Sequence, residues 1–345
     1  MLPLYPFLIF PEFHERVWGT RDLRPYFSRV VEGNPIGEVW LTGEECRVAS
    51  GPLAGETIGS LAVQHGAAFI GEASPQPNRF PLLIKFLFPR QKLSIQVHPD
   101  DERAHQLGQP CGKTECWYVA RALPGAQVGL GLRTGITREM FRLAVQANQA
   151  EHMLNWLDVR AGEMLYVDAG TVHAVGPNSI LVETQQNCDI TYRLYDYGRP
   201  RELHLELGMA AIRDKTHAGL VQPQLVQSQM AAPHAGDAHQ LLVASPSFIV
   251  EKHQLTDPVA MAATPSSVQV LVSLDGGAVV ECPGAPSISM MRGDTVIIPA
   301  SSPAVTLRPQ WSAEILRMTL PSQTVAEPLT TLNTTNASSS PISHT

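Results

Sequence analysis

The sequence has few charges and no long apolar run. Asp, Glu, Lys and Arg make up 17% of the 345 residues, and the formal net charge is −7 without a cluster of Lys and Arg. Because nucleic acids and anionic membrane surfaces attract basic patches, we expect neither as a partner. No stretch of about 18 apolar residues predicts a membrane span.

Cysteine is also scarce. The five cysteines are an odd number and lie far apart, so they do not form a disulfide framework, and Cys111 and Cys116 do not form a C-x-x-C pair. Residues 1–13 are apolar but carry three prolines, and they lack both a basic region and a small-residue cleavage site. We therefore expect no signal peptide and a reducing, cytoplasmic location.

Apolar residues, glycine and proline are abundant. The apolar set makes up 44% of the chain, with 26 glycines and 28 prolines, and helical periodicity is scarce. This composition favours a mainly β fold with many short strands and turns, and the length favours two domains. A short helix is predicted at 58–65. The clearest helical stretch is 137–157, which we interpret as the core of a helical insertion at about 134–158.

Four polar residues have a spacing that predicts a metal site. Residues 94–98 alternate, so Gln96 and His98 share one face of a predicted strand. Glu115 opens the next apolar run, and His173 follows a tight turn at Gly170. A lone His in an apolar strand is more often a core residue, but two imidazoles with oxygen ligands suit zinc or another borderline divalent ion.

Three cationic residues are further candidates. Lys85 lies inside an apolar run, where it either extends to solvent or faces a polar cavity and an anionic substrate. Arg193 follows Asp189 by four residues on one face of a predicted strand. The two form a simple ion pair, or Arg193 presents its fork of donors to a phosphate or an oxyanion. Lys113 lies two residues before Glu115, close enough for acid–base chemistry or for polarising an oxygen.

An internal repeat predicts two related barrels. Residues 292–305 align without gaps on 161–174, and both begin with a Gly-acid turn that leads into an apolar strand and a small-residue turn. His173 aligns with Ala304, so the second copy lacks this ligand. We predict a metal-binding domain at 1–212, a linker at 213–239, a second domain without metal at 240–321, and a disordered tail at 322–345.

Several motifs carry a resemblance to a known family. Residues 162–173 resemble the second cupin motif, with Asp168 where Pro is usual. Five segments, in order over roughly residues 8–212, resemble the short bacterial form of type I mannose-6-phosphate isomerase. Cys188 departs from the usual Ser, and the second half resembles the family only in its general strand pattern. The matching segments are 15–19, 93–101, 112–118, 170–175 and 185–193.

The resemblance implies a fold of two cupin-like β-barrels (jelly rolls) with one zinc ion per chain. It implies Arg193 and Lys113 as active-site residues, and it places Lys85 and Asp189 in the substrate pocket. The implied metal ligands are Gln96, His98, Glu115 and His173.

The implied reaction interconverts mannose 6-phosphate and fructose 6-phosphate through an enediol. A divalent ion acts as a Lewis acid on the sugar oxygens, and a positioned acid/base moves the proton. One alternative is a bicupin metal-dependent oxidoreductase, which normally has a richer His set than one with Gln96. Another is a non-catalytic sugar-phosphate-binding cupin, which the presence of Lys113 and Arg193 disfavours. The oligomeric state is open, and a monomer is compatible with the sequence.

Overall fold

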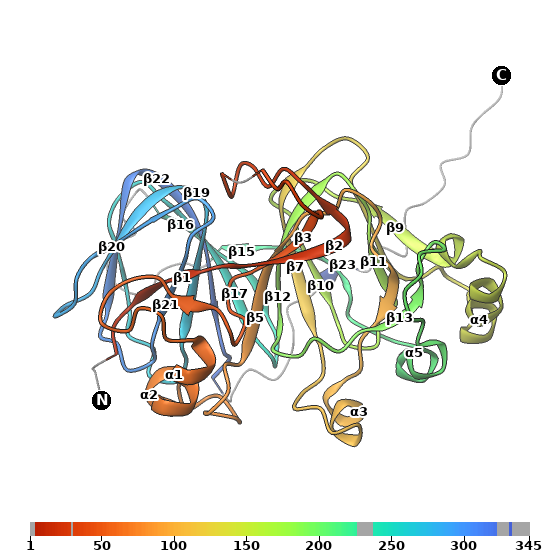
Figure 1. Cartoon of the computed structure of the whole chain (residues 1–345), viewed down its shortest axis with the longest axis horizontal. Coiled ribbons are helices and arrows are strands. Elements are labelled where there is room, and N and C mark those ends of the chain that lie inside the picture. Colours follow the sequence, from red (N-terminus) through yellow and green to blue (C-terminus); the bar gives the residue numbers. More distant parts are fainter. Residues whose placement is uncertain (1–3, 29, 226–236, 323–330, 333–345) are drawn as a thin grey trace.

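The chain forms two β-barrels that lie side by side (Figure 1). The structure is a computed structural model that describes residues 4–28, 30–225, 237–322 and 331–332. Antiparallel strands dominate it, and the helices are short and peripheral. The prediction of a mainly β fold with two cupin-like barrels is confirmed.

The first barrel is built from two sheets that face one another. The larger sheet has the order β2-β3-β5-β12-β7-β10-β14-β23 and the smaller has the order β13-β6-β11-β8-β9. The strands of the larger sheet are β2 (Glu12–Thr20), β3 (Ile36–Trp40), β5 (Leu82–Leu87), β12 (Ser179–Gln186), β7 (Glu115–Ala122), β10 (Met164–Val167), β14 (Gly219–Val221) and β23 (Thr331–Leu332). Those of the smaller are β13 (Tyr192–Tyr195), β6 (Ile95–Val97), β11 (His173–Val175), β8 (Gln127–Leu132) and β9 (Leu154–Asp158).

The second barrel is formed by one curved sheet with the order β15-β16-β17-β22-β19-β21-β1-β4. Two short strands extend it, because β18 pairs with β22 and β20 pairs with β19. Its strands are β15 (Gln224–Leu225), β16 (Asp237–Ala244), β17 (Ile249–Leu255), β22 (Val305–Thr319), β19 (Gln269–Glu281), β21 (Thr295–Ile298), β1 (Phe7–Phe10), β4 (Arg47–Val48), β18 (Val259–Met261) and β20 (Ile288–Met291).

Both barrels contain strands from outside their predicted ranges. β1 pairs with β21, with Phe7 opposite Ile297, so the N-terminal strand completes the sheet of the second barrel. Within the predicted linker 213–239, β14 pairs with β10 of the first barrel and β15 pairs with β16 of the second. In the predicted tail, β23 pairs with β14, and residues 323–330 and 333–345 lie outside the described residues. The domain boundaries at 212 and 240 therefore do not coincide with the sheet boundaries.

The helices are α1 (Ile58–His65), α2 (Ala67–Ile70), α3 (Asp101–Gln106), α4 (Arg138–Gln146) and α5 (Leu205–Ala211), with a 3₁₀ turn, η1 (Ala150–Met153). Thr57 and Ser60 form a capping box that begins α1. The helix predicted for 137–157 begins as expected at Thr137 but ends at Gln146. Asn148 then adopts a positive φ of 57°, and the apolar residues that follow pair in β9 with β8. Pairing with β8 therefore places Leu154–Asp158 in a strand, although the local sequence pattern predicts a helix to residue 157.

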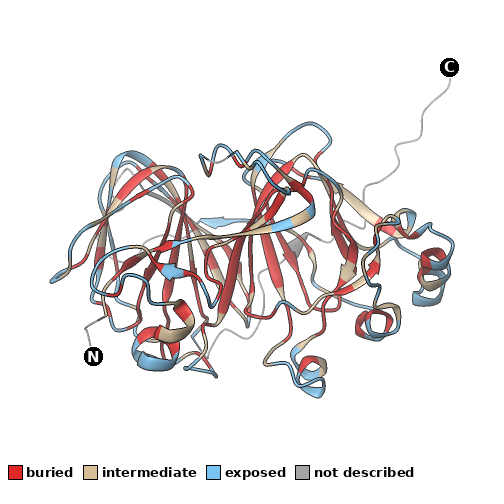
Figure 2. Cartoon of the chain, in the orientation of Figure 1, coloured by how far each residue is buried: buried red, intermediate tan, exposed pale blue. Residues whose placement is uncertain are grey.

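Buried residues lie along the strands of both barrels (Figure 2). One apolar cluster contains residues of both barrels, including Phe86 of β5 and Val270 of β19. The hydroxyl of Tyr118 on β7 donates a hydrogen bond of 2.6 Å to Glu314 on β22, which ties the two barrels together. None of the helices in the described ranges has the length and apolar character that crossing a bilayer requires.

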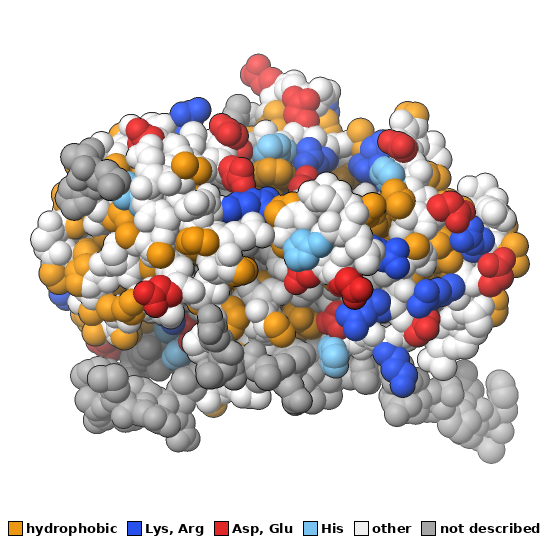
Figure 3. Space-filling model, turned by 90° about the horizontal axis from the view of Figure 1, so that it is seen from below, with side chains coloured by type: hydrophobic (Ala, Val, Ile, Leu, Met, Phe, Trp, Pro, Cys, Tyr) orange, Lys and Arg blue, Asp and Glu red, His pale blue; other side chains and the backbone are white. Residues whose placement is uncertain are grey.

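Charged side chains are unevenly distributed over the surface. Seen from below, Lys, Arg, Asp and Glu gather over the half of the molecule that carries α4 and α5, whereas the second barrel presents mostly apolar and uncharged side chains (Figure 3). Some of these charges are paired with each other, as Arg142 of α4 is with Glu206 of α5. Such exposed pairs contribute little to stability.

Candidate active site

Strand pairing in the smaller sheet of the first barrel aligns three of the predicted site residues. His173 on β11 lies directly opposite Gln96 on β6, and Gln96 lies opposite Arg193 on β13. Residues that are direct partners in adjacent strands point to the same face of a sheet. The register of three strands therefore places the imidazole, the amide and the guanidinium in one row.

The larger sheet contributes a second row. Glu183 on β12 pairs with Lys85 on β5 and with Trp117 on β7, and Lys85 in turn pairs with Trp40 on β3. Glu115 lies two residues before Trp117, so its side chain points to the same face. The two rows face each other across the interior of the barrel.

Two turns fix the position of His98, which follows β6. The amide of Gly170 donates a hydrogen bond of 2.8 Å to the carbonyl of His98, and Gly170 has φ 88°, a conformation that favours glycine. The amide of Lys113 donates to the carbonyl of Pro99 at 3.0 Å. At Gly112 a Cβ atom would lie 2.5 Å from the backbone of Asp100, so only glycine allows this close approach.

His98, Glu115 and His173 converge at one point. Their potential ligand atoms all lie within 4.8 Å of one another, and all three residues are buried. Nε2 of His98 lies 3.5 Å from Oε2 of Glu115, and Nε2 of His173 lies 3.3 Å from Oε1. The amide nitrogen of Gln96 is 3.1 Å from Nε2 of His173. The structure therefore brings together all four residues that the sequence predicts as ligands.

Hydrogen bonds set the tautomer of both imidazoles. Nδ1 of His98 is 2.9 Å from the carbonyl of Ile190, and Nδ1 of His173 is 2.9 Å from the carbonyl of Thr171. A carbonyl accepts only, so each Nδ1 carries the proton and each Nε2 presents its lone pair to the interior. Metal-binding histidines are oriented by the same kind of outer hydrogen bond.

The protonation equilibria of the cluster fit a site for a cation. Burial raises the pKa of Glu115 to about 7, although Lys113 opposes this shift. Burial also lowers the pKa of His173 to about 4, and burial together with Lys113 lowers the pKa of His98 well below its usual value. Both imidazoles are thus neutral at pH 7, which is the form that binds a metal.

The unsatisfied carboxylate of Glu115 gives a direct test of whether a metal fits the site. Neither carboxylate oxygen of Glu115 has a hydrogen bond of good geometry, although Nζ of Lys113 lies 3.1 Å from Oε2 as an ion pair. The same ammonium lies 3.1 Å from Nε2 of His98. A buried carboxylate without a hydrogen bond is costly unless a cation satisfies it, whereas Nε2 of His98 faces the ammonium of Lys113 and Nε2 of His173 faces the amide of Gln96. Two His and one Glu form a donor set that suits zinc.

A cavity of about 300 Å³ opens beside the cluster. Gln96 and Lys113, which contact the cluster, line the cavity together with Lys85, Asp189 and Arg193, so the structure places all the predicted catalytic and substrate residues at one cavity. Four further charged residues line it that sequence reasoning did not single out: Arg16, Glu38, Glu183 and Arg201.

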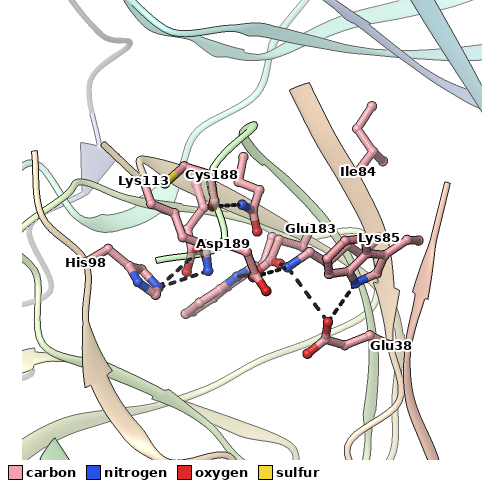
Figure 4. Close-up of polar contacts among 12 residues, drawn as sticks. Glu38, Ile84, Lys85, His98, Lys113, Glu183, Cys188 and Asp189 are labelled. Atoms are coloured by element: carbon pink, nitrogen blue, oxygen red, sulfur yellow. Dashed lines mark hydrogen bonds and ion pairs between the residues drawn. The ribbon is translucent and has the colours of Figure 1, made fainter. Parts of the chain in front are cut away.

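Lys85 faces this cavity rather than the solvent. Its ammonium lies 3.1 Å from Glu183, 3.5 Å from Asp189 and 3.9 Å from Glu38, as the close-up shows (Figure 4). Burial alone would lower the pKa of Lys85, but these carboxylates outweigh it and raise the pKa far above its usual value. Lys85 is therefore a permanent cation. It faces a polar cavity and does not extend to solvent, which decides between the two alternatives that the sequence left open.

Arg193 has no carboxylate partner among the described residues. Asp189 pairs with Lys85 instead, so the alternative of a simple Asp189–Arg193 ion pair is wrong. Nη1 of Arg193 donates to the carbonyl of Glu202 at 2.7 Å, and its Nε has no hydrogen-bond partner. Burial and the nearby charge of Arg201 lower the pKa of Arg193. A bound anion would accept a hydrogen bond from the unpartnered Nε and would stabilise the positive charge of Arg193.

The residues missed by sequence reasoning are those that hold others in place. Glu183 receives a hydrogen bond of 3.0 Å from Nε1 of Trp117 and pairs with Lys85. Glu38 forms an ion pair with Arg16 at 2.8 Å and accepts a hydrogen bond of 2.7 Å from Nε1 of Trp40. The one available signal was that Glu38 interrupts an apolar strand and that Glu183 directly follows the apolar run 180–182.

A barrel with a buried His–Glu–His cluster beside a cation-lined cavity defines a cupin-type protein with a candidate metal centre. The family model "Phosphomannose isomerase type I, catalytic domain" matches residues 7–118. The chain is 32% identical to the mannose-6-phosphate isomerase of Streptococcus mutans over 85% of its own length and 92% of that protein. The chain therefore belongs to the type I phosphomannose isomerase family.

Other comparisons agree with this assignment. The probable mannose-6-phosphate isomerase GmuF of Bacillus subtilis is 36% identical over 62% of this chain and 71% of that protein. The crystal structure of the mannose 6-phosphate isomerase from Bacillus subtilis superposes with a TM-score of 0.81 at 28% identity, covering 91% of this chain and 99% of that one. A mutant of the phosphomannose isomerase from Salmonella typhimurium shares the fold, with a TM-score of 0.73 at 14% identity, covering 92% of this chain and all of that one.

Proposed function

We propose that this chain interconverts mannose 6-phosphate and fructose 6-phosphate through an enediol, with one zinc ion held by Gln96, His98, Glu115 and His173. The observation that carries the proposal is the convergence of both Nε2 atoms on the buried Glu115 carboxylate. The membership of the family supports the choice of substrate. A cytoplasmic location is part of the proposal, in agreement with five cysteines that are all unpaired in the described residues.

The cations of the cavity would bind and orient the sugar phosphate. Arg193 presents a guanidinium whose Nε is unpartnered, and Arg201 lies close enough to lower its pKa. Arg201 already forms a bidentate pair with Asp196, so Arg193 supplies the available donor fork, which suits a phosphate or a developing oxyanion. Lys85 has its charge balanced by three carboxylates, so we assign it to shaping the cavity and holding Asp189 rather than to binding the phosphate alone.

The reaction needs a proton to move between two adjacent carbons beside a carbonyl. A bound zinc ion would supply Lewis acidity at the sugar oxygens. The ammonium of Lys113 lies 3.1 Å from Nε2 of His98 and 3.1 Å from Oε2 of Glu115, within reach of the reacting carbons. Burial would lower its pKa, but Glu115 and Glu183 raise it, so Lys113 is an acid while it pairs with Glu115. A cation bound to Glu115 would lower the pKa of Lys113 and bring the amine closer to the range of a general base.

Proton transfer through a side chain can be tested by isotope exchange. Isomerisation of mannose 6-phosphate in D₂O should place deuterium on the product carbon, because an enediol route exposes the proton to a group that exchanges with solvent. His98→Ala should lose both turnover and exchange. Turnover without any deuterium in product or in recovered substrate would contradict the enediol route, and absence of activity on mannose 6-phosphate in the zinc-loaded chain would contradict the assignment of the substrate.

A further inference from the structure

The second barrel contains its own cluster of metal-ligating side chains. His239 on β16 and Glu251 and His253 on β17 place their potential ligand atoms within 4.8 Å of one another. His239 and His253 are direct cross-strand partners, and Glu251 lies two residues before His253 on the same face. None of the three belongs to the site described above.

These side chains point into the second barrel. Leu255 is on the same face of β17 and packs in the apolar interior with Leu271 and Ile315. Lys252, on the opposite face, lies 5.8 Å from the ring of Tyr118 in the first barrel. The cluster thus occupies the interior wall of its barrel, as Glu115 and His173 do in the first.

The cluster contains one anion and two imidazoles. Nε2 of His239 is 2.9 Å from Oε1 of Glu251, while Arg317 of β22 pairs with the other carboxylate oxygen. Glu251 thus directs one carboxylate oxygen at the imidazoles while the other is held by Arg317.

We propose that His239, Glu251 and His253 bind a divalent transition-metal ion such as Zn²⁺ inside the second barrel. Ligand atoms at about 2.0–2.1 Å from a tetrahedral ion lie about 3.3 Å apart, which is close to the 2.9 Å between His239 and Glu251. The two rings stack with centroids 4.2 Å apart, so His239, which is partly exposed, must turn its lone pair toward the ion. A water molecule supplies the fourth ligand.

Arg317 positions the carboxylate of this site. Its Nε donates a hydrogen bond of 2.8 Å to Gln269, which holds the guanidinium against Glu251. The outer oxygen of Glu251 is thereby fixed, and the inner oxygen is left for the ion. The positive charge of Arg317 also repels a cation, so this site should bind metal more weakly than the site of the first barrel.

The inference replaces the expectation that the second barrel holds no metal. That expectation rested on Ala304, which aligns with His173 in the repeat. The cluster comes from β16 and β17, which lie outside the aligned segments. An alignment of one strand–turn unit cannot detect ligands carried by other strands.

The number of metal ions bound per chain tests the proposal. Each protein is dialysed against a slight excess of zinc chloride and then against metal-free buffer, and bound zinc is measured by mass spectrometry. We expect two zinc ions in the unaltered chain, one in His239→Asn, one in His98→Ala and none in the double variant. His152→Asn, an exposed His outside both clusters, is the matched control and should retain two.

The outcome separates the two sites. If the first barrel binds no metal, the unaltered chain holds one ion that His239→Asn still removes, so failure of the proposed function leaves this inference standing. If His239→Asn and the more buried His253→Gln both retain the zinc content of their parent, the second site does not exist.

His239→Asn should also leave isomerase activity unchanged, because the cluster lies outside the catalytic cavity. The Co²⁺-loaded His98→Ala variant should show a d–d absorption that His239→Asn abolishes.

Discussion

Gln96 and His173 are direct cross-strand partners, and their side-chain nitrogen atoms lie 3.1 Å apart. This pairing joins β6 to β11 at the candidate metal centre. The side-chain amide oxygen and nitrogen of a glutamine are distinguished only by their hydrogen bonds, and rotation of the Gln96 amide would present its oxygen to the position shared with His173. The register of one short strand pair thus decides whether Gln96 can act as a ligand.

We expect Gln96→Leu to weaken zinc binding by about 10²-fold, because an oxygen ligand is replaced by an apolar side chain of similar size. Gln96→Glu keeps an oxygen and adds a negative charge, so it should retain zinc but lower kcat by reducing the positive charge available to the substrate oxygens. Competition with a chromophoric chelator measures the affinity. Equal affinity of Gln96→Leu and the unaltered chain would show that Gln96 is not a ligand.

Zinc affinity should depend on pH through Glu115. Burial raises the pKa of this carboxyl to about 7, so the ion must displace a proton at lower pH. Affinity should therefore fall about tenfold per pH unit between pH 7 and pH 5 and level off above pH 7. His173, whose pKa is lowered to about 4, adds little competition in this range. A flat affinity from pH 7 to pH 5 would contradict the raised pKa, and Glu115→Gln should remove the slope together with most of the affinity.

Arg193→Ala should lower kcat/KM by at least about 10²-fold, or roughly 2.7 kcal/mol of transition-state binding. Arg193 lines the cavity with an unpartnered Nε and is not a ligand, so zinc content should stay normal. A rise confined to KM would indicate a phosphate anchor, and a fall confined to kcat would indicate contact with the enediolate. Arg193→Lys keeps the charge without the fork and should rescue only in part. If Arg193→Ala has the same kcat and KM as the unaltered chain, Arg193 contributes neither to substrate binding nor to catalysis.

Lys85→Met should destabilise the fold by about 3–5 kcal/mol, because it leaves the buried carboxylate of Glu183 without its cation, while Glu38 keeps its pair with Arg16. The free energy of unfolding in urea measures the loss. The double variant Lys85→Met/Glu183→Gln should recover part of the lost stability by removing the unpaired charge of Glu183. If Lys85→Met is as stable as the parent, the ion pairs of Lys85 do not stabilise the barrel.

The sequence was sufficient to predict the barrel architecture and the proposed ligands. Alternation at 94–98 and the turn at Gly170 reflect local geometry, and α1 has the predicted bounds Ile58–His65. Local pattern failed where a distant partner decides the conformation. β9 forms because β8 offers an edge, and β1 belongs to the second barrel through pairing with β21.

The roles of Glu38 and Glu183 could not be predicted for the same reason. Each acquires its role from Lys85, which lies on another strand. Strand order and register determine these contacts, and neither is encoded by the spacing within a single segment. The cluster of His239, Glu251 and His253 was missed likewise, since it depends on the pairing of β16 with β17.

The central claim is that a metal held by His98, Glu115 and His173 is required for isomerisation. The most direct test removes all metal with a chelator and then measures turnover of mannose 6-phosphate as zinc is restored. The His239→Asn background leaves only the site of the first barrel to be filled. The account predicts no turnover in the metal-free chain and activity that rises in proportion to bound zinc until one ion per chain is reached. Full turnover of the metal-free chain would contradict it.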